Sequence, residues 1–502
     1  MIRRASASVR TTALCMALAC SVLSLPASAQ TPEKQPGVAD YLARIAAIDD
    51  SGPMLNAVLA IAPDALAQET AARAMAGPLA ARAVLIKDNI EMAGPLPTTA
   101  GSLALKDNRT GRDAPLVAHL RRAGAVLLGK TNLSEWANIR SSDSSSGWSA
   151  VGGQTRNPHA LDRSPCGSSS GSGAAVAAGL AWAAIGTETD GSITCPASVN
   201  GIVGFKPTVG MVSRTHIVPI SHSQDTAGPM TTSVADAALL MNALAETDPA
   251  DPATLDADRH KRDFTAGLAT ASLKGLRIGV LRRQAGDQAK LLAFFDKALA
   301  DLTAAGAVLV DIDYAIPGEM RQDEFTVLLY ELRTDLGAYL RGLPGSPPVR
   351  SLADVIAFNQ ANAAELRWFG QDIFEQAEAT TDRAAYEKAR GTSLRLAGPE
   401  GIDRLLAAHD VSVLIAPTRG PAWPIDLVTG DHSAGGVGAG SLAAVAGYPH
   451  LTVPMGAVEG LPVGLSFIGA RWDDARVLAA GAAYERVRSV AVPVPGLKRW
   501  SE

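Results

Sequence analysis

The sequence is poor in several features on which whole classes of protein depend. Its 502 residues include only four cysteines, aromatic residues make up 5%, and the formal net charge is −5. This slightly acidic balance gives no basic surface for nucleic acid, so no nucleic-acid partner is expected. Beyond the N-terminal segment, no apolar run reaches the roughly 18 residues of a membrane span. The eight histidines are scattered without metal-site spacing, so neither a metal nor another cofactor is expected.

The N-terminus has the pattern of an export signal. Arg3 and Arg4 precede a mostly apolar stretch over residues 14–25, and Ala27-Ser28-Ala29 offers the small residues of a cleavage site. We therefore expect residues 1–29 to be a signal peptide and the mature protein to be periplasmic or secreted. A buried N-terminal helix and a lipoprotein anchored at Cys20 are the alternatives.

Cleavage would leave two cysteines, Cys166 and Cys195, each beside a serine-containing turn. In an oxidising compartment such a pair can form a disulfide. Two buried thiols that pack as small apolar side chains are the alternative. The sequence leaves both readings open.

Short apolar runs alternate with helical patterns along most of the chain. The runs occupy residues 83–86, 125–128, 183–185, 276–281, 308–311 and 413–417. This alternation predicts an α/β fold with a mixed central β-sheet covered by helices on both faces. Since neither a repeat nor a low-complexity linker interrupts the pattern, we expect one domain over residues 30–502.

Residues 316–400 differ because their pattern is helical and rich in large apolar side chains, namely Phe325, Leu328, Leu329, Tyr330, Leu332, Phe358, Trp368 and Phe369. This segment predicts either a helical cap that borders a substrate cleft or a plain packing layer. In the first case Trp148 is a further candidate for the wall of the cleft, by analogy alone.

Two serines and a lysine are the most informative residues. Ser168 lies in the turn Ser-Pro-Cys-Gly-Ser-Ser-Ser-Gly-Ser-Gly at 164–173, and Ser192 lies in Gly-Thr-Glu-Thr-Asp-Gly-Ser-Ile at 186–193. Lys87 ends the apolar run 83–86, and burial there would lower its pKa and make it a base. A serine becomes a nucleophile when a base takes its proton. The trio therefore predicts Ser192 as nucleophile, Ser168 as proton bridge and Lys87 as base.

The residues before Ser192 also carry chemical information. Asp190 and Gly191 follow a predicted strand, so consecutive backbone amides can point at one spot. Such donors stabilise the oxyanion of acyl transfer by about 3–4 kcal/mol each. A flexible serine turn and a surface lysine are the plain alternatives to this whole reading.

Residues 124–131 satisfy the P-loop pattern G-x-x-x-x-G-K-T, which would place Lys130 on a phosphate. The four interior residues are Ala, Val, Leu and Leu, which are typical of a strand rather than of a glycine-rich loop. A nucleotide-binding protein is therefore disfavoured.

Residues 167–171 satisfy G-x-S-x-G, which would make Ser169 an α/β-hydrolase nucleophile, with His409 or His450 as its base. That turn requires a strand directly before it. Residues 156–165 are polar and contain two prolines, so no strand fits and this reading is also disfavoured.

Together the segments resemble the amidase signature family, and within it the peptide amidase branch, over roughly residues 40–490. The motifs that carry the resemblance are Lys-Asp-Asn at 87–89, the turn at 164–172, Gly-Thr-Glu-Thr-Asp-Gly-Ser-Ile at 186–193, Gly-Phe-Lys-Pro-Thr-Val-Gly at 204–210 and Asp-Thr-Ala-Gly-Pro at 225–229. Weaker matches lie at 124–136 and 461–465.

The resemblance implies roles for particular residues. Lys87 would be the base, Ser168 the bridge after a cis peptide, and Ser192 the acylated nucleophile. The amides of Thr189, Asp190, Gly191 and Ser192 would form the oxyanion hole. The fold implied is a single α/β domain with a mixed sheet.

The chain also departs from the family. Many members carry Gly-Gly-Ser-Ile-Arg where this chain has Asp190-Gly191-Ser192-Ile193-Thr194. Asp190 fits the peptide amidase branch, as does Cys166. The absence of arginine at 194 argues against a substrate role borrowed from members that have it.

The resemblance implies a cofactor-free monomer that hydrolyses carboxamides and releases ammonia, with the C-terminal amide of peptides as favoured substrate. One alternative is an amidase of the same family for other small aliphatic or aryl amides. Another is an amidotransferase component that supplies ammonia to aminoacyl-tRNA, against which the export signal argues.

Overall fold

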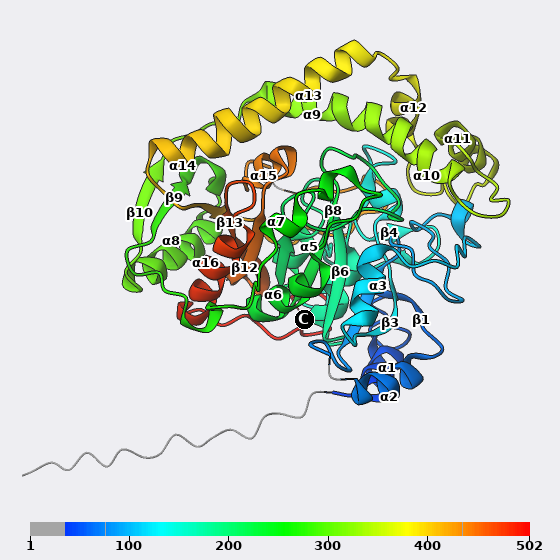
Figure 1. The fold of residues 1–502 in the computed structure, drawn as a ribbon, viewed down its shortest axis with the longest axis horizontal. Helices are drawn as coiled ribbons and strands as arrows, with labels where there is room; N and C mark the ends of the chain where they lie inside the picture. The colour runs from blue at the N-terminus through cyan, green and yellow to red at the C-terminus, as the bar shows by residue number, and fades with distance from the viewer. Residues whose placement is uncertain (1–35, 76, 434, 502) are drawn as a thin grey trace, which may run out of the picture. The chain divides into compact units, whose positions relative to one another are not determined.

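A mixed sheet of eleven strands forms the centre of the chain (Figure 1). The computed structural model describes residues 36–75, 77–433 and 435–501, so the predicted signal peptide, 1–29, lies outside the described residues. Residues Gly37–Glu502 form one compact unit. In sheet order the strands are β1 (Val58–Ile61), β3 (Val126–Thr131), β2 (Ala83–Lys87), β6 (Ala183–Glu188), β8 (Thr226–Thr231), β7 (Val203–Lys206), β12 (His450–Val458), β13 (Leu461–Ile468), β11 (Val413–Pro417), β9 (Arg277–Leu281) and β10 (Val308–Ile312).

The strand directions confirm the predicted mixed sheet. β2 runs parallel to β3 and to β6. At the other end of the sheet β9 runs parallel to β10 and to β11. Antiparallel pairs through β8, β7, β12 and β13 join the two parallel groups. A separate two-stranded sheet is formed by β4 (Trp148–Ser149) and β5 (Gly153–Gln154).

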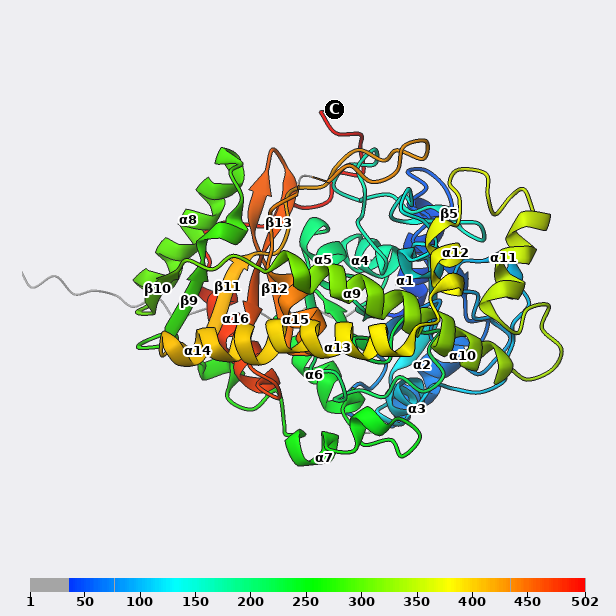
Figure 2. The ribbon, with the colours of Figure 1, turned by 90° about the horizontal axis from the view of Figure 1, so that it is seen from above.

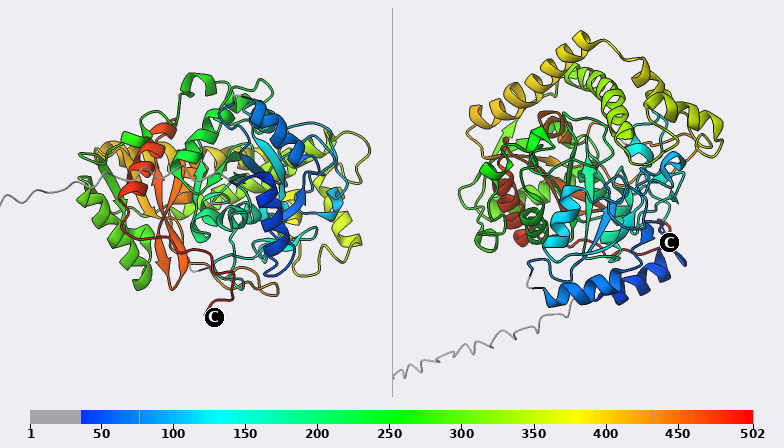
Figure 3. Two further views of the ribbon diagram at one scale, coloured as in Figure 1. Left: turned by 90° about the horizontal axis from the view of Figure 1, so that it is seen from below. Right: turned by 45° about the vertical axis from the view of Figure 1, so that its right-hand side comes forward.

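Helices cover both faces of the sheet, as predicted (Figure 2). One face carries α1 (Val38–Ile48), α2 (Ala65–Ala74), α4 (Ser170–Ala177) and α5 (Thr194–Val199), and further along α14 (Arg404–Ala408) and α15 (Gly440–Ala446). The opposite face carries α3 (Pro115–Arg122), α6 (Val234–Leu244), α8 (Ala289–Ala304) and α16 (Asp474–Val487). The short α7 (Ala257–His260) lies in the connection from α6 to β9. Helices α1 and α2, dark blue in Figure 3, pack against each other, and α2 contacts β3.

Alternation along β2 places Lys87. Val84 and Ile86 join the core under α3 and α6, while Ala83 and Leu85 join the core under α1, α2 and α4. Successive side chains of a strand point to opposite faces, so Lys87 follows Leu85 toward the α4 side. Because that side is filled by α4, the ammonium end cannot reach bulk water.

The segment 316–400 is helical, as the sequence predicted. It comprises α9 (Gly318–Glu331), a π-helical turn (Leu332–Leu336), α10 (Gly337–Arg341), α11 (Leu352–Ala361), α12 (Asp372–Ala379) and α13 (Arg383–Ala397). Helices α9 and α13 lie side by side (Figures 1 and 2), and the rings of Tyr330 and Tyr386 stack between them at 4.2 Å. None of the helices in the described ranges is long and apolar enough to cross a membrane.

Candidate active site

Lys87 sits fully buried at the end of β2 and is held by hydroxyl and carbonyl groups. Its Nζ donates to Ser168 Oγ at 2.8 Å. It also donates to Thr187 Oγ1 at 2.8 Å and to the Thr187 carbonyl at 3.2 Å. Lys87 and Ser168, far apart in the sequence, are therefore in direct contact.

The surroundings of Lys87 disfavour its charged form. Burial, the largest effect, lowers the pKa of Lys87 to about 7, against the opposing attraction of the Asp225 and Glu188 carboxylates. An ordinary lysine stays protonated far above this pH. At neutral pH a sizeable fraction of Lys87 is therefore neutral and able to accept a proton through its contact with Ser168.

Ser168 is fixed by the turn that leads into α4. The side chain is buried, and the Gly167–Ser168 peptide is cis. A Cβ on Gly167 would lie 2.1 Å from Ser134 Oγ, so a larger residue would displace the Ser134 side chain. Ser170 Oγ donates to the Cys166 carbonyl at 2.6 Å and closes the turn.

Ser192 lies in the turn between β6 and α5. Gly191 has a φ of +81°, a conformation that favours glycine. The Glu188 carboxylate accepts from the amides of Ile193 at 2.7 Å and Thr194 at 2.9 Å, which fixes the far side of the turn. The Ser192 carbonyl accepts from the Ser169 amide at 3.1 Å, so the two serine turns are joined directly.

The backbone amides predicted for the oxyanion hole are available. Among the hydrogen bonds between described residues, none uses the amides of Thr189, Asp190, Gly191 or Ser192 as donors. The side chains of this segment are anchored instead: Thr189 Oγ1 donates to Asp225 Oδ1 at 2.6 Å, and Asp190 Oδ2 accepts from Ser441 Oγ at 2.7 Å. Side-chain anchoring leaves the main chain free to bind a ligand oxygen.

Two cavities flank this segment. One, of about 350 Å³, is lined by Asp190, Gly191, Thr194, Cys195, Arg321, Glu324, Thr418, Arg419, Gly435, Gly436, Val437, Gly438, Gly440, Ser441 and His450. The other, of about 440 Å³, is lined by Thr187, Thr189 and Asp225, together with loop residues 214–220 and His222. A bound molecule can therefore approach the Asp190–Gly191 peptide from a cavity lined by both acidic and basic side chains.

The helical segment 316–400 borders both cavities, though not through the residues expected. α9 contributes Arg321 and Glu324 to the smaller cavity. The turn after α9 and helix α10 contribute Asp335, Ala338 and Tyr339 to the larger one. Trp148 instead packs edge-on against Phe369 at 5.1 Å and is 6% exposed, and neither ring is among the described residues that line the two cavities.

Lys130, the lysine of the P-loop pattern, belongs to a strand. Its Nζ pairs with Asp88 Oδ1 at 3.0 Å and donates to the Ile90 carbonyl at 2.6 Å and to Thr98 Oγ1 at 2.9 Å. The pattern residues form β3, and the Lys130 ammonium group is paired inside the core. Residues 124–131 therefore do not form a phosphate-binding loop.

Ser169, the serine of the G-x-S-x-G pattern, is also occupied. Its hydroxyl donates to the Thr187 carbonyl at 3.0 Å and accepts from the Thr187 amide at 3.2 Å. His450, buried in β12, contacts Ser466 Oγ at 2.6 Å through Nε2. Neither group is arranged as a nucleophile with its base.

The described residues contain one histidine–carboxylate group close enough to consider for a metal, with ligand atoms within 4.8 Å: His222, Glu331 and Asp335. His222 Nδ1 lies 2.9 Å from Asp335 and Nε2 lies 3.2 Å from Glu331, and Arg390 is 3.8 Å from Glu331. Both ring nitrogens face carboxylates and a second cation is present, so this group is an ion-pair cluster.

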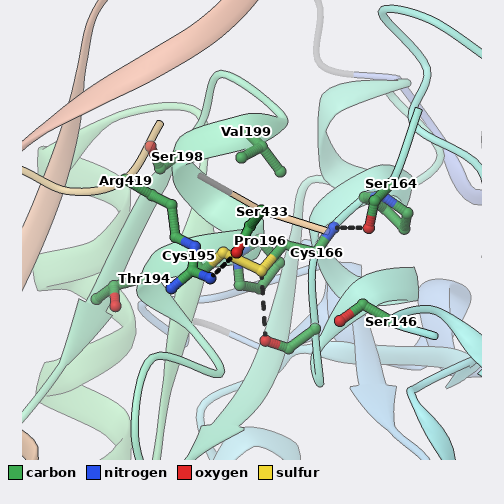
Figure 4. The surroundings of a disulfide bond; sticks show 12 residues. Ser146, Ser164, Cys166, Thr194, Cys195, Pro196, Ser198, Val199, Arg419 and Ser433 are labelled. Atoms are coloured by element: carbon green, nitrogen blue, oxygen red, sulfur yellow. Dashed lines mark hydrogen bonds between the residues drawn. A yellow bond between two sulfur atoms is a disulfide. The ribbon is translucent and has the colours of Figure 1, made fainter. Parts of the chain in front are cut away.

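Cys166 and Cys195 form a disulfide, with 6.0 Å between their Cα atoms (Figure 4). The sequence left open either a disulfide or two buried thiols, and the structure has the disulfide. Each cysteine is 5% exposed. The bond connects the Ser168 turn to the start of α5.

Sequence reasoning did not identify Thr187 and Glu188, which organise the site. Thr187 supplies two of the three acceptors of Lys87, and Glu188 braces the turn around Ser192. Their signal was their place in the same motif as Ser192. Arg321, Glu324 and Arg419 gave no comparable signal because they come from distant segments.

Known proteins are similar to this chain in sequence and in fold. The family model for Amidase matches residues 38–478. The chain is 37% identical to a probable amidase of Arabidopsis thaliana, over 89% of this chain and 86% of that protein. It is 33% identical to a putative amidase of Schizosaccharomyces pombe, over 86% of this chain and 79% of that protein. Among solved structures, native peptide amidase from Stenotrophomonas maltophilia superimposes with a TM-score of 0.87 at 50% identity, covering 92% of this chain and 94% of that chain.

Proposed function

This chain belongs to the amidase signature family, and on that premise we propose that it hydrolyses the C-terminal carboxamide of peptides and releases ammonia. The likeness to peptide amidase at 50% identity supports this choice of substrate. Within the described ranges, Ser169 Oγ bonds to the Thr187 backbone and to no histidine, which supports a lysine-based mechanism. The observation that carries the proposal is the 2.8 Å contact between the buried Lys87 ammonium nitrogen and Ser168 Oγ.

In the proposed first step, Ser192 Oγ bonds to the amide carbon. Its proton passes to Ser168 Oγ, and the proton of Ser168 passes to neutral Lys87. The Lys87 pKa of about 7 suits this role, because a base with a pKa near the working pH is present in its neutral form and still attracts the proton.

The negative charge that develops on the carbonyl oxygen needs donors fixed before the reaction. The amides of Thr189, Asp190, Gly191 and Ser192 make no hydrogen bond to other described residues, and we assign this role to them. Each such donor contributes about 3–4 kcal/mol to lowering the barrier.

Collapse of the tetrahedral intermediate breaks the C–N bond while the relay returns the proton to nitrogen. Ammonia leaves, and the acyl group stays on Ser192. Water then attacks the ester and gives its proton to the same relay. The relay returns a proton to Ser192 Oγ as the ester C–O bond breaks, the carboxylic acid leaves, and the enzyme returns to its starting state.

A single peptide tests the substrate class. An amidated peptide that contains one internal glutamine is incubated with the protein, and the products are located by fragmentation in a mass spectrometer. We expect conversion of the C-terminal amide to the acid, intact peptide bonds and intact glutamine. Hydrolysis of the glutamine, or cleavage of internal peptide bonds with the C-terminal amide left intact, would contradict the proposed substrate class.

We further propose that the protein acts as a monomer after export, with cleavage of the signal peptide near Ala29. The Cys166–Cys195 disulfide supports an oxidising compartment, because such bonds are rare in reducing ones. Sequencing of the N-terminus of protein recovered from the periplasm or medium tests the export. An intact Met1 on protein that stays in the cytoplasm would contradict it.

A further inference from the structure

The disulfide closes a loop that contains both candidate serines. Cys166 stands just before Ser168, and Cys195 stands just after Ser192, with a sequence separation of 29 between the two cysteines. The loop includes α4, β6 and the whole turn from Thr189 to Ser192. No other bond in the described residues joins the two turns covalently.

Each cysteine is fixed to its own turn by backbone groups. The Cys195 amide donates to the Gly191 carbonyl at 2.8 Å, which ties its position to the segment assigned to the oxyanion hole. The Cys166 amide donates to Ser164 Oγ at 3.1 Å, and the Cys166 carbonyl accepts from Ser170 Oγ at 2.6 Å. A shift of either sulfur is therefore passed to the turn that carries a serine.

The noncovalent links between the turns are hydrogen bonds. The Ser169 amide donates to the Ser192 carbonyl at 3.1 Å. Ser169 Oγ also donates to the Thr187 carbonyl at 3.0 Å and accepts from the Thr187 amide at 3.2 Å. Asn200 Nδ2 bridges the Pro165 carbonyl at 2.9 Å and the Pro196 carbonyl at 2.7 Å. These are neutral hydrogen bonds, which bend and lengthen easily compared with a covalent bond. The disulfide is the stiffest connection between the two turns.

The disulfide borders the smaller cavity through one of its cysteines. Cys195 lines this cavity of about 350 Å³ together with Asp190 and Gly191. Figure 4 shows Arg419 and Ser433 beside the sulfur atoms, and Arg419 donates to Ser433 Oγ at 2.6 Å. A nearby guanidinium favours the thiolate that reduction produces. The disulfide is thus buried in the fold, with Cys195 beside the cavity.

We propose that the Cys166–Cys195 disulfide positions Ser192 relative to Ser168, so that full turnover requires the oxidised protein. This inference rests on the proposed function. A dithiol would reduce the disulfide by two electrons, giving two cysteine thiols and one disulfide of the reductant. Since a displacement of about 1 Å at a reacting group can cost about 10²-fold in rate, loosening this link should act on catalysis rather than on binding.

The test compares oxidised and dithiothreitol-reduced wild-type protein well below the unfolding temperature, with thiols counted in each sample. We expect kcat for an amidated peptide to fall at least about tenfold on reduction while KM changes little, and reoxidation to restore it. The rate at which a sulfonyl fluoride labels Ser192 should fall by a similar factor. If the disulfide is only structural, its reduction should lower the unfolding temperature but leave kcat and the labelling rate of the folded protein unchanged.

The double variant C166S/C195S is the matched control. It should show the low kcat of the reduced protein and no response to dithiothreitol. Reduced wild-type protein and a folded double variant that both keep kcat within twofold of the oxidised enzyme would overturn the inference. If oxidised wild-type protein hydrolyses no carboxamide, the proposed function fails instead, and the two outcomes are distinct. If the double variant does not fold, reversible reduction of the wild type decides alone.

Discussion

Two neighbouring parallel strands each carry a buried lysine at their carboxyl end, and the two lysines are held differently. Lys87 on β2 and Lys130 on β3 are both fully excluded from solvent. Lys87 meets Ser168 and Thr187. Lys130 meets the Asp88 carboxylate at 3.0 Å.

The comparison shows that burial alone does not distinguish the two lysines. Burial lowers the pKa of both side chains, but only Lys130 has a carboxylate in contact, which favours its charged form. Hydroxyl partners can both accept and pass on a proton, whereas a carboxylate holds the ammonium in place. Substitutions at each lysine and its partners should therefore separate a base at Lys87 from a structural cation at Lys130.

The largest effect is expected for the base and the nucleophile. Lys87→Ala and Ser192→Ala should each lower kcat for an amidated peptide by about 10³-fold or more, since removal of one member of a proton-transfer unit disables all of it. Ser168→Ala should lose somewhat less, because water can replace a bridging hydroxyl in part. Turnover is measured on protein with a wild-type circular dichroism spectrum. Ser192→Ala with a tenth of wild-type activity would exclude the assignment.

Lys130→Met should lower the stability of the protein rather than its turnover. It leaves the buried Asp88 without its cation, and breaking a buried pair costs about 3–5 kcal/mol of unfolding free energy. Urea denaturation at neutral pH measures the loss. The double variant K130M/D88N should recover part of it, because no charge is left unpaired. A Lys130→Met protein that is as stable as the wild type but has lost its turnover would contradict a purely structural role for Lys130.

The secondary structure around both lysines could be predicted from the sequence. The apolar run before Lys87 predicted a buried strand end, and β2 confirms it. The interior of the P-loop pattern predicted a strand, and β3 confirms that too. Both predictions depend on local pattern, which a single segment carries in full.

The partners of each lysine could not be predicted in the same way. Asp88 follows Lys87 directly in the sequence, yet it pairs with Lys130, because adjacent residues at a strand end point in different directions. Arg321 and Arg419 reach the cavity beside Gly191 from α9 and from the end of β11. Such contacts depend on how distant elements pack, and no motif records them.

The pH dependence of turnover sharpens the comparison. Lys87 must be neutral to act as the base, so kcat/KM should fall about tenfold per pH unit below its pKa of about 7 and level off above it. The pH profile should be the same at low and high salt, because the group is buried. A rate that stays constant from pH 8 to pH 5 would contradict a lysine base.

The same pKa has a consequence for stability. The folded-state value lies below the ordinary 10.5, so the unfolded chain binds more protons between about pH 7 and 10.5 and stability rises with pH across that window. Lys87→Met should remove this rise, and its advantage over the wild type should be greatest at pH 7 and below. Thermal unfolding of both proteins from pH 6 to 9.5 measures the difference.

The smallest effect concerns Thr187, whose hydroxyl accepts from Lys87 Nζ at 2.8 Å and from Asn89 Nδ2 at 3.0 Å. Thr187→Val keeps the shape of the side chain and removes that acceptor. An acceptor stabilises the ammonium, so its loss should lower the pKa of Lys87 and move the acid limb of the pH–rate profile to lower pH by about 0.5–1 unit, the equivalent of one hydrogen bond. Thr98→Val is the matched control, because Thr98 accepts from Lys130 in the same way, at 2.9 Å. It should leave the profile where it is. A shift of the acid limb in Thr98→Val, or a shift to higher pH in Thr187→Val, would mean that the proton measured in the rate is not the one on Lys87.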